Sequence, residues 1–215
     1  MLKIILILLY FLVSTKLVFA EIWDFGLGIL LVPDRVENYP NPTQIEIGVS
    51  SVKGYGLSVS KQSSSSFKDL TKKEIIKDNT YTSKFWLSSD AFMMFYRIEN
   101  YVNRWDLGIM HNRNIYTAMV EKKGDTEESE ESTLVLSYTG PYLQYSNTLS
   151  GYENGPYYGI RIFYLSTTIP DSNSYDFIES NDTYIQEYND KLKSFIYENN
   201  PKTSAGINLT YGLRW

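Results

Sequence analysis

The chain has 215 residues, with 20 basic and 25 acidic residues, a formal net charge of −5 and no cysteine. The lack of cysteine excludes a disulfide framework and a lipid-modified cysteine, and the acidic balance argues against nucleic-acid binding. Aromatic residues reach 15%, with 19 tyrosines among them, which favours β-strands and the aromatic girdles of membrane barrels.

Residues 1–20 have the composition of a secretory signal peptide. Lys3 precedes an apolar run from Ile4 to Val13, and Ala20 stands before Glu21. The apolar run is about half of the ~20 residues that a membrane-spanning helix needs, so an uncleaved anchor is the weaker alternative. We therefore expect cleavage after Ala20 and a single domain over residues 21–215.

Three strands are predicted in the first part of this domain. Apolar side chains recur there with the period of two that places them on one face of a strand. Glycine and polar residues, among them Asp24 and Glu46, occupy the other face. The predicted strands are Ile22–Val32, Gln44–Val52 and Tyr55–Lys61, with a tight turn at Lys53–Gly54 between the last two.

Three more strands are predicted in the middle of the chain: Lys84–Ile98, one that begins at Arg104 and extends as far as Val120, and Thr133–Tyr145. Pro141 cannot donate a ladder hydrogen bond, so it indicates a bulge or a break in the last of them. The connections Gln62–Ser83 and Glu121–Ser132 are rich in lysine and in glutamate respectively. We expect both to be solvated loops, with pairing between them as the alternative.

The last third of the chain predicts a strand over Tyr157–Thr167, a helix over Thr183–Glu198 and a final strand over Thr203–Trp215. Thr183 and Gln186 have capping-box spacing at the start of the helix, and Asn199–Asn200–Pro201 end it. An apolar stripe at helical spacing needs cover from neighbouring loops, the barrel mouth, lipid headgroups or a partner protein. Its residues are Ile185, Tyr188, Leu192 and Phe195.

These strands predict an all-β fold, an eight-stranded antiparallel up-and-down transmembrane barrel with a helical insertion in its last external loop. Long and short connections alternate along the chain, as they do in outer-membrane barrels. An even number of strands places both termini on one side, which is the periplasmic side in such proteins.

The polar face carries charges of both signs, and these are expected to pair in the lumen because isolated buried charges are costly. The predicted lumen network is Asp24, Glu46, Asp90, Asp106, Arg161 and Arg214. A soluble, secreted lipocalin-like barrel that binds a small ligand is the alternative, with its apolar face inside and these charges in solvent.

The signal peptide, the alternating strands and the closing apolar face resemble small bacterial outer-membrane barrels of the OmpA/OmpX type. The resemblance covers the architecture of residues 21–215 and is specific at the two ends. It implies an outer-membrane location, contact with outer-membrane lipid, and recognition of the last strand by the membrane's assembly machinery. The residues that match this assembly signal are Tyr211, Leu213 and Trp215, although the family more often ends in phenylalanine.

For function, the sequence favours a non-enzymatic surface protein whose external loops serve envelope integrity, adhesion or contact with an unknown partner. A narrow channel, or a carrier of small hydrophobic molecules, is the alternative. His111 is the single histidine, and Asp106, five residues away, falls on the opposite strand face, so we predict no catalytic site. No motif for a metal or cofactor occurs, and we expect neither.

Overall fold

A computed structural model describes the part of the chain that forms the sheet and the helix. The described residues are 22–31, 43–51, 53–66, 72–76, 79–100, 102–124, 128–149, 151, 154–167, 182–199 and 203–215. The predicted signal peptide lies outside them. The strands are β1 Ile22–Leu31, β2 Thr43–Ser50, β3 Tyr55–Ser66, β4 Lys72–Ile76, β5 Asn79–Asn100, β6 Asn103–Lys123, β7 Glu128–Thr148, β8 Gly155–Ser166 and β9 Thr203–Arg214, and helix α2 spans Thr183–Asn199.

Eight of these strands close into an antiparallel barrel, as the sequence predicts. The sheet order is β3-β2-β1-β9-β8-β7-β6-β5-β4, and an additional pairing between β3 and β5 closes the ring. Strand pairings followed once around the barrel from Glu99 return to Ser89 of the same strand, a stagger of ten residues. A stagger of this kind means that the strands tilt strongly against the barrel axis.

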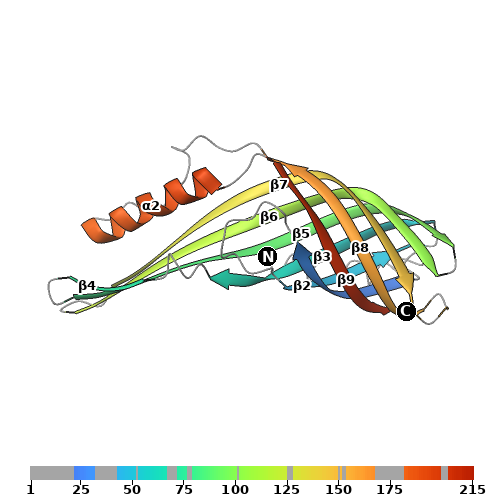
Figure 1. Ribbon diagram of the computed structural model, residues 1–215, viewed down its shortest axis with the longest axis horizontal. Helices are drawn as coiled ribbons and strands as arrows, with labels where there is room; N and C mark the ends of the chain where they lie inside the picture. Colours follow the sequence, from blue (N-terminus) through green and yellow to red (C-terminus); the bar gives the residue numbers. More distant parts are fainter. Residues whose placement is uncertain are drawn as a thin grey trace, which may run out of the picture.

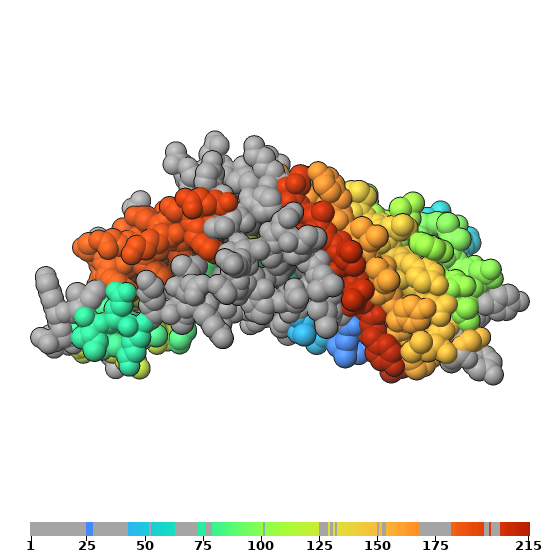
Figure 2. All heavy atoms as spheres, viewed as in Figure 1, coloured from blue at the N-terminus to red at the C-terminus, as the bar shows by residue number. Residues whose placement is uncertain are grey.

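Strands β5, β6 and β7 continue well beyond the barrel, and their paired ends extend the same sheet there. They are 22, 21 and 21 residues long, whereas β8 and β9 have 12 residues each. Strand β4 adds to the edge of β5 on this extension, and α2 lies along it (Figure 1). In the space-filling view α2 and β4 occupy one end of the molecule, and β8 and β9 the other (Figure 2). We call the extension with β4 and α2 the platform.

The platform corrects two loop predictions. Gln62–Ser83 contains the end of β3, all of β4 and the start of β5. Glu121–Ser132 contains the end of β6 and the start of β7. The acidic run is therefore partly strand. Lys122 stands opposite Glu128 across the ladder, and opposite charges on paired strands attract.

Outward-facing side chains of the barrel are apolar and exposed. Leu107 and Ile162 are 61% and 56% exposed, and the series continues around the barrel. Inward positions at the end that holds the short turns are polar and buried, among them Gln44, Arg97 and Arg161. The barrel is thus inverted relative to a soluble protein: its apolar face is outside.

The first residue of β1 and the last of β9 lie at the same end of the barrel as the three short turns. Asp24 pairs with Arg214 across these two strands, and the turns follow β2, β5 and β7. Aromatic side chains gather at this end: the rings of Tyr55 and Tyr96 are 5.3 Å apart, and those of Trp105 and Tyr145 are 4.8 Å apart. This is the arrangement of an interfacial aromatic girdle.

Pro141 causes no bulge. It stands in register opposite Ile109 of β6, and the β7–β8 pairing has the same register at Thr139 and at Tyr142. Among the described pairs, Gly140 and Pro141 are not paired with residues of β8. The proline therefore leaves a gap in one ladder, where its missing N–H would have donated, without displacing the strands.

Candidate functional site

The lumen of the barrel is crossed by a buried ion pair between Arg161 of β8 and Glu46 of β2. The Nη2 atom of Arg161 lies 2.7 Å from both carboxylate oxygens of Glu46, and its Nε donates to Gln144 Oε1 at 2.8 Å. Arg161 is 1% exposed and Glu46 9%. Strands β1 and β9 lie between β2 and β8 in the ring. The ion pair therefore connects two strands that are not neighbours, across the lumen.

A second buried pair joins Arg97 of β5 and Asp106 of β6. Nε and Nη2 of Arg97 lie 2.7 and 2.9 Å from the two oxygens of Asp106, and Nη1 donates to Ser50 at 2.9 Å. This two-point geometry is the strongest form of arginine–carboxylate contact. Arg97 is absent from the predicted lumen set, since it shares its strand parity with Phe85 and Met93, which alternation assigns to an apolar face.

Neutral side chains complete the network. Gln44 donates to Glu46 at 3.0 Å and accepts a hydrogen bond from Asn208. Arg214 donates to Ser146 at 2.9 Å, and its guanidinium lies 4.6 Å from the centre of the Tyr157 ring. Amides and hydroxyls in these positions satisfy some of the donors and acceptors that the charged residues leave over, while Arg161 Nη1 has no hydrogen-bond partner among the described residues.

The predicted lumen set divides as follows. Glu46, Asp106, Arg161 and Arg214 are buried inside the barrel, and the backbone of Asp24 is paired with that of Arg214, while its side chain lies outside the described structure. Asp90 was misplaced. It occupies the outward parity of β5, where it is half-buried beside Lys61 and Arg113. The error arose because both faces of β5 are apolar, so alternation alone did not show which face was inside.

Large side chains fill the remaining lumen, and inward glycines make room for them. A Cβ on Gly56 would lie 2.2 Å from the Phe95 ring, and one on Gly26 would lie 2.8 Å from the Tyr157 hydroxyl. The space left among the ion pairs, Phe95 and Tyr157 suits little more than a water molecule. At the level of the ion pairs, side chains of the described residues therefore fill the lumen.

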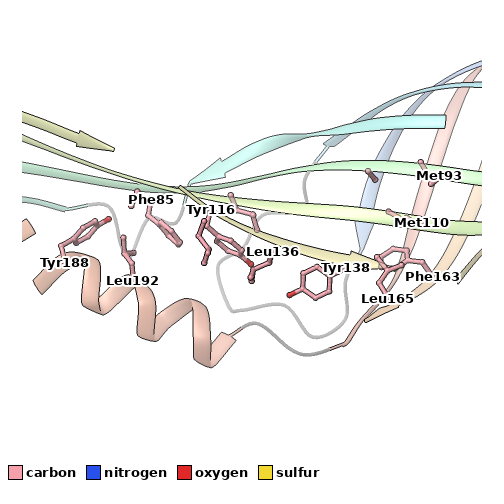
Figure 3. Packing of buried hydrophobic residues seen from close by; sticks show 14 of the residues in the cluster. Phe85, Met93, Met110, Tyr116, Leu136, Tyr138, Phe163, Leu165, Tyr188 and Leu192 are labelled. Atoms are coloured by element: carbon pink, nitrogen blue, oxygen red, sulfur yellow. The ribbon is translucent and has the colours of Figure 1, made fainter. Parts of the chain in front are cut away.

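The platform has an apolar core between its sheet and α2, and this core continues into the lumen through Met93 and Met110 (Figure 3). Phe85, Leu136 and Leu192 are at most 1% exposed, and the rings of Phe85 and Phe195 meet edge to face at 6.0 Å. All four residues of the predicted helix stripe face this core: Ile185, Tyr188 and Leu192 are buried, and Phe195 packs against them partly buried. The strand extensions therefore cover the stripe.

Asp182 attaches the start of α2 to the sheet. Its Oδ1 accepts from the backbone N–H groups of Tyr184 and Ile185 at 2.9 and 3.3 Å, and its Oδ2 accepts from Tyr81 and Lys122 at 3.0 and 3.2 Å. Burial alone would raise the pKa of Asp182, but the Lys122, Tyr81 and backbone hydrogen bonds outweigh it and lower that pKa below its usual value.

The predicted capping box does not form. Asp182 is the N-cap, and Thr183 is already the first helical residue. The side chain of Gln186 instead donates to Asp190 one turn later, at 3.1 Å. Aspartate is at least as good an N-cap as threonine, and it precedes the helix by one residue. Burial also raises the pKa of Tyr188 to about 12.

His111 faces outward on β6, and its Nδ1 lies 2.8 Å from Thr139 Oγ1. Asp106 faces the lumen and is bound to Arg97, so the two residues form no dyad. Within the described ranges there is no group of three or more histidine or acidic side chains placed to hold a metal ion. No described helix combines the length and apolar character needed to cross a bilayer.

The predicted assembly-signal residues lie together on the outward face of the last strand. Tyr211, Leu213 and Trp215 are 54%, 50% and 57% exposed. They lie at the barrel end that holds the short turns, beside the start of β1. Their side chains extend the outward apolar surface to the final residue of the chain.

No family model matches the sequence, and comparison with curated proteins gives no match. Among solved structures the chain is similar to Ail, the attachment invasion locus protein of Yersinia pestis, with 13% identity, a TM-score of 0.41 and coverage of 90% of this chain and 95% of that one. A major outer membrane protein from Thermus thermophilus gives 8% identity, a TM-score of 0.49 and coverage of 90% and 99%. Neisserial surface protein A gives 10% identity, a TM-score of 0.44 and coverage of 90% of this chain and 94% of that one. Similarity this distant assigns no activity to the chain.

Proposed function

We propose that this chain is a non-enzymatic barrel of a bacterial outer membrane that presents the platform at the cell surface for attachment or partner contact. The observation that carries the proposal is the inversion of the barrel, with exposed apolar side chains outside and paired charges inside. In water, a continuous apolar surface of this kind would drive association. In a bilayer, a closed barrel satisfies its backbone hydrogen bonds and meets lipid with apolar side chains.

The plugged lumen supports a presenting role over a conducting one. Ion entry would require Glu46–Arg161 or Arg97–Asp106 to separate, and each would then leave a buried charge without its partner. The platform supports presentation because it extends beyond the barrel and packs helix α2 on its sheet through buried apolar side chains. The outward position of His111, away from Asp106, supports the absence of hydrolytic chemistry.

Location and orientation are testable by labelling, because the chain contains no cysteine. Single variants Lys191→Cys on α2 and Lys53→Cys in the turn after β2 place one thiol at each end, at residues that are exposed. On intact cells a membrane-impermeant maleimide should label Lys191→Cys and should reach Lys53→Cys after the outer membrane is opened. Equal labelling of both variants on intact cells would contradict the orientation with periplasmic termini.

Insertion is tested separately by gel mobility. Residues 21–215, refolded in detergent or phosphatidylcholine vesicles, should migrate differently before and after boiling in SDS, because closed membrane barrels stay folded in unheated SDS. A protein that folds in plain buffer and shows no heat-dependent shift would overturn the membrane function.

Recognition of the last strand by the assembly machinery is part of the same proposal. Trp215→Gln removes one exposed aromatic side chain from the outward face and leaves the lumen unchanged. We expect less of this variant at the cell surface but normal refolding in detergent. Equal loss in both assays would assign Trp215 to barrel stability instead.

A second candidate is the carriage of small apolar molecules. One observation favours it: beyond the ion pairs, the inner wall of β5–β8 becomes apolar, with Met93, Met110 and Phe163 at most 5% exposed. Binding of a radiolabelled fatty acid that saturates at one molecule per barrel, and that weakens in Met110→Asn, would support this role. Binding that rises without saturation would exclude it.

A further inference from the structure

The first charges beyond the apolar belt form a single outward-facing row. Lys61 of β3, Asp90 of β5 and Arg113 of β6 are successive cross-strand neighbours. The adjacent row on the belt side contains Val59 and Phe92, which are 48% and 41% exposed. Lys61 is exposed, and Asp90 and Arg113 are half-buried. The change from apolar to charged side chains occurs between neighbouring rows.

This row is confined to one arc of the barrel. On β1, β2, β8 and β9 the outward positions that the structure describes hold no charged side chain. On the platform side of the barrel, the last residue of β8 is Ser166 and the first residue of β9 is Thr203. The charges lie where β5 and β6 leave the barrel for the platform. On β6 and β7 the belt-side row of Val59 and Phe92 continues with His111 and Thr139, which are joined by the 2.8 Å contact described above. Polar groups thus border the charged row on the same face.

We propose that Lys61 and Arg113 bind the phosphate groups of an anionic lipid in the outer leaflet of the membrane. This inference rests on the proposed function, since the row lies at headgroup height when the belt lies in the hydrocarbon. Arginine presents a planar fork that fits phosphate, and lysine supplies a compact charge. Strands lie roughly 4.8 Å apart, so the two cations are about 10 Å from each other across Asp90, a spacing that suits a headgroup with more than one phosphate.

Asp90 sets the strength of this site. It stands between the two cations, so its carboxylate competes with phosphate for both. The row therefore has an excess of one positive charge without lipid, and the geometry predicts opposite effects for substitutions of neighbouring residues. Removing Lys61 or Arg113 weakens headgroup binding, and neutralising Asp90 strengthens it.

The probe is lipid A, the phosphorylated glycolipid anchor of outer leaflets, with its dephosphorylated form as the reference. Residues 21–215 are refolded into phosphatidylcholine vesicles that contain either lipid, extracted in a zwitterionic detergent and separated by gel filtration. The lipid retained per barrel is then quantified. We expect more lipid A than dephosphorylated lipid on the wild-type protein, with the difference reduced at high salt because screening weakens exposed charges.

Each lost cation should reduce retention by about fivefold, the effect of roughly 1 kcal/mol per basic residue near an anionic surface. Lys61→Gln and Arg113→Gln should therefore act alike, and Asp90→Asn should raise retention. Lys84→Gln is the matched control, because Lys84 lies on the same face of β5, six positions from Asp90, and contacts Glu121 at 3.5 Å. This variant should retain lipid A like the wild-type protein.

Two results would overturn the inference: equal retention by the wild-type protein and the Lys61→Gln/Arg113→Gln double variant, or equal losses in Lys84→Gln and the double variant. A fall in Asp90→Asn would also overturn it. The gel-mobility assay in pure phosphatidylcholine separates this failure from failure of the proposed function. A barrel that inserts there but shows no lipid preference keeps its membrane role and loses this site.

Discussion

The lumen and the platform share strands β5, β6 and β7, yet the inward side chains at the two ends of these strands have opposite chemistry. At the turn end the inward positions of β5, β6 and β7 hold Arg97, Asp106 and Gln144. Further along the same faces they hold Phe85, Tyr116 and Leu136. Strand alternation fixes which positions share a face, but what lies opposite that face decides whether polar or apolar side chains are stable there.

The largest expected effect on stability comes from breaking the Glu46–Arg161 ion pair of the lumen. Glu46→Ala leaves Arg161 buried without its carboxylate, which costs about 3–5 kcal/mol of unfolding free energy. Denaturant unfolding of the refolded barrel in detergent measures it. Hydrogen exchange of α2 should stay as in the wild-type protein, because the helix packs on the other core.

A paired substitution is the control for this experiment. Glu46→Met with Arg161→Met removes both charges at once, and replacement of a buried ion pair by apolar residues is often neutral. The double variant should therefore be more stable than Glu46→Ala. Equal destabilisation in both would mean that the two side chains contribute by packing and that their charge is incidental.

The second prediction concerns the apolar core. Leu192→Ala removes a fully buried side chain from beneath α2, and such truncations cost about 2–5 kcal/mol. We expect faster hydrogen exchange throughout α2 with an unchanged heat-dependent mobility shift. Lys191→Ala, on the exposed side of the same turn, should alter neither. Loss of the mobility shift in Leu192→Ala would show that the platform and the barrel fold as one unit.

These two cores explain how far the sequence alone could predict the molecule. The eight barrel strands and the helix were predicted because alternation and the 3.6-residue stripe are local signals. Strand β4 and the strand character of Glu128–Ser132 were missed because lysine and glutamate favour loops when cross-strand partners are unknown. The length of β5–β7 depends on pairing between segments, which is not a local property.

The lumen network could be predicted in part for a similar reason. Glu46, Asp106 and Arg161 stand alone among apolar alternations, so their parity marked them. Arg97 follows apolar residues of its own parity, among them Leu87, Met93 and Phe95, so alternation did not mark it as a lumen charge. Its partner Asp106 was the available signal, since a buried carboxylate needs a cation within reach.

The third prediction tests the attachment of α2 at its start. Asp182→Ala removes the N-cap and the acceptor for Tyr81 and Lys122, which should cost about 1–2 kcal/mol of docking free energy. Hydrogen exchange of the first turn of α2 measures this loss. Asp182→Asn keeps the capping oxygen and should lose less. Equal exchange in both variants would show that the capping oxygen adds nothing and that the contact of the carboxylate with Lys122 carries the whole effect.

Acid should reproduce the same loss in the unaltered protein. The pKa of Asp182 is lowered on folding from its ordinary value of 3.8, so its carboxylate stabilises the docked helix above that pH. This stability is lost as pH falls below 3.8 and through the lower folded value. Exchange in the first turn of α2 should therefore rise in that range for the wild-type protein and change little in Asp182→Asn.

The smallest expected effect distinguishes the observed cap from the capping box that the sequence predicted. In a capping box, Gln186 would return to the backbone at the helix start, and its loss would destabilise the first turn. In the structure its side chain contacts Asp190 on the exposed side of the helix, a kind of pair worth about 0.2–0.5 kcal/mol. Gln186→Ala should therefore alter first-turn exchange far less than Asp182→Ala, and by about as much as Asp190→Ala, its partner. If Gln186→Ala matched Asp182→Ala instead, the helix start would depend on Gln186, and Asp182 could not be its main attachment to the platform.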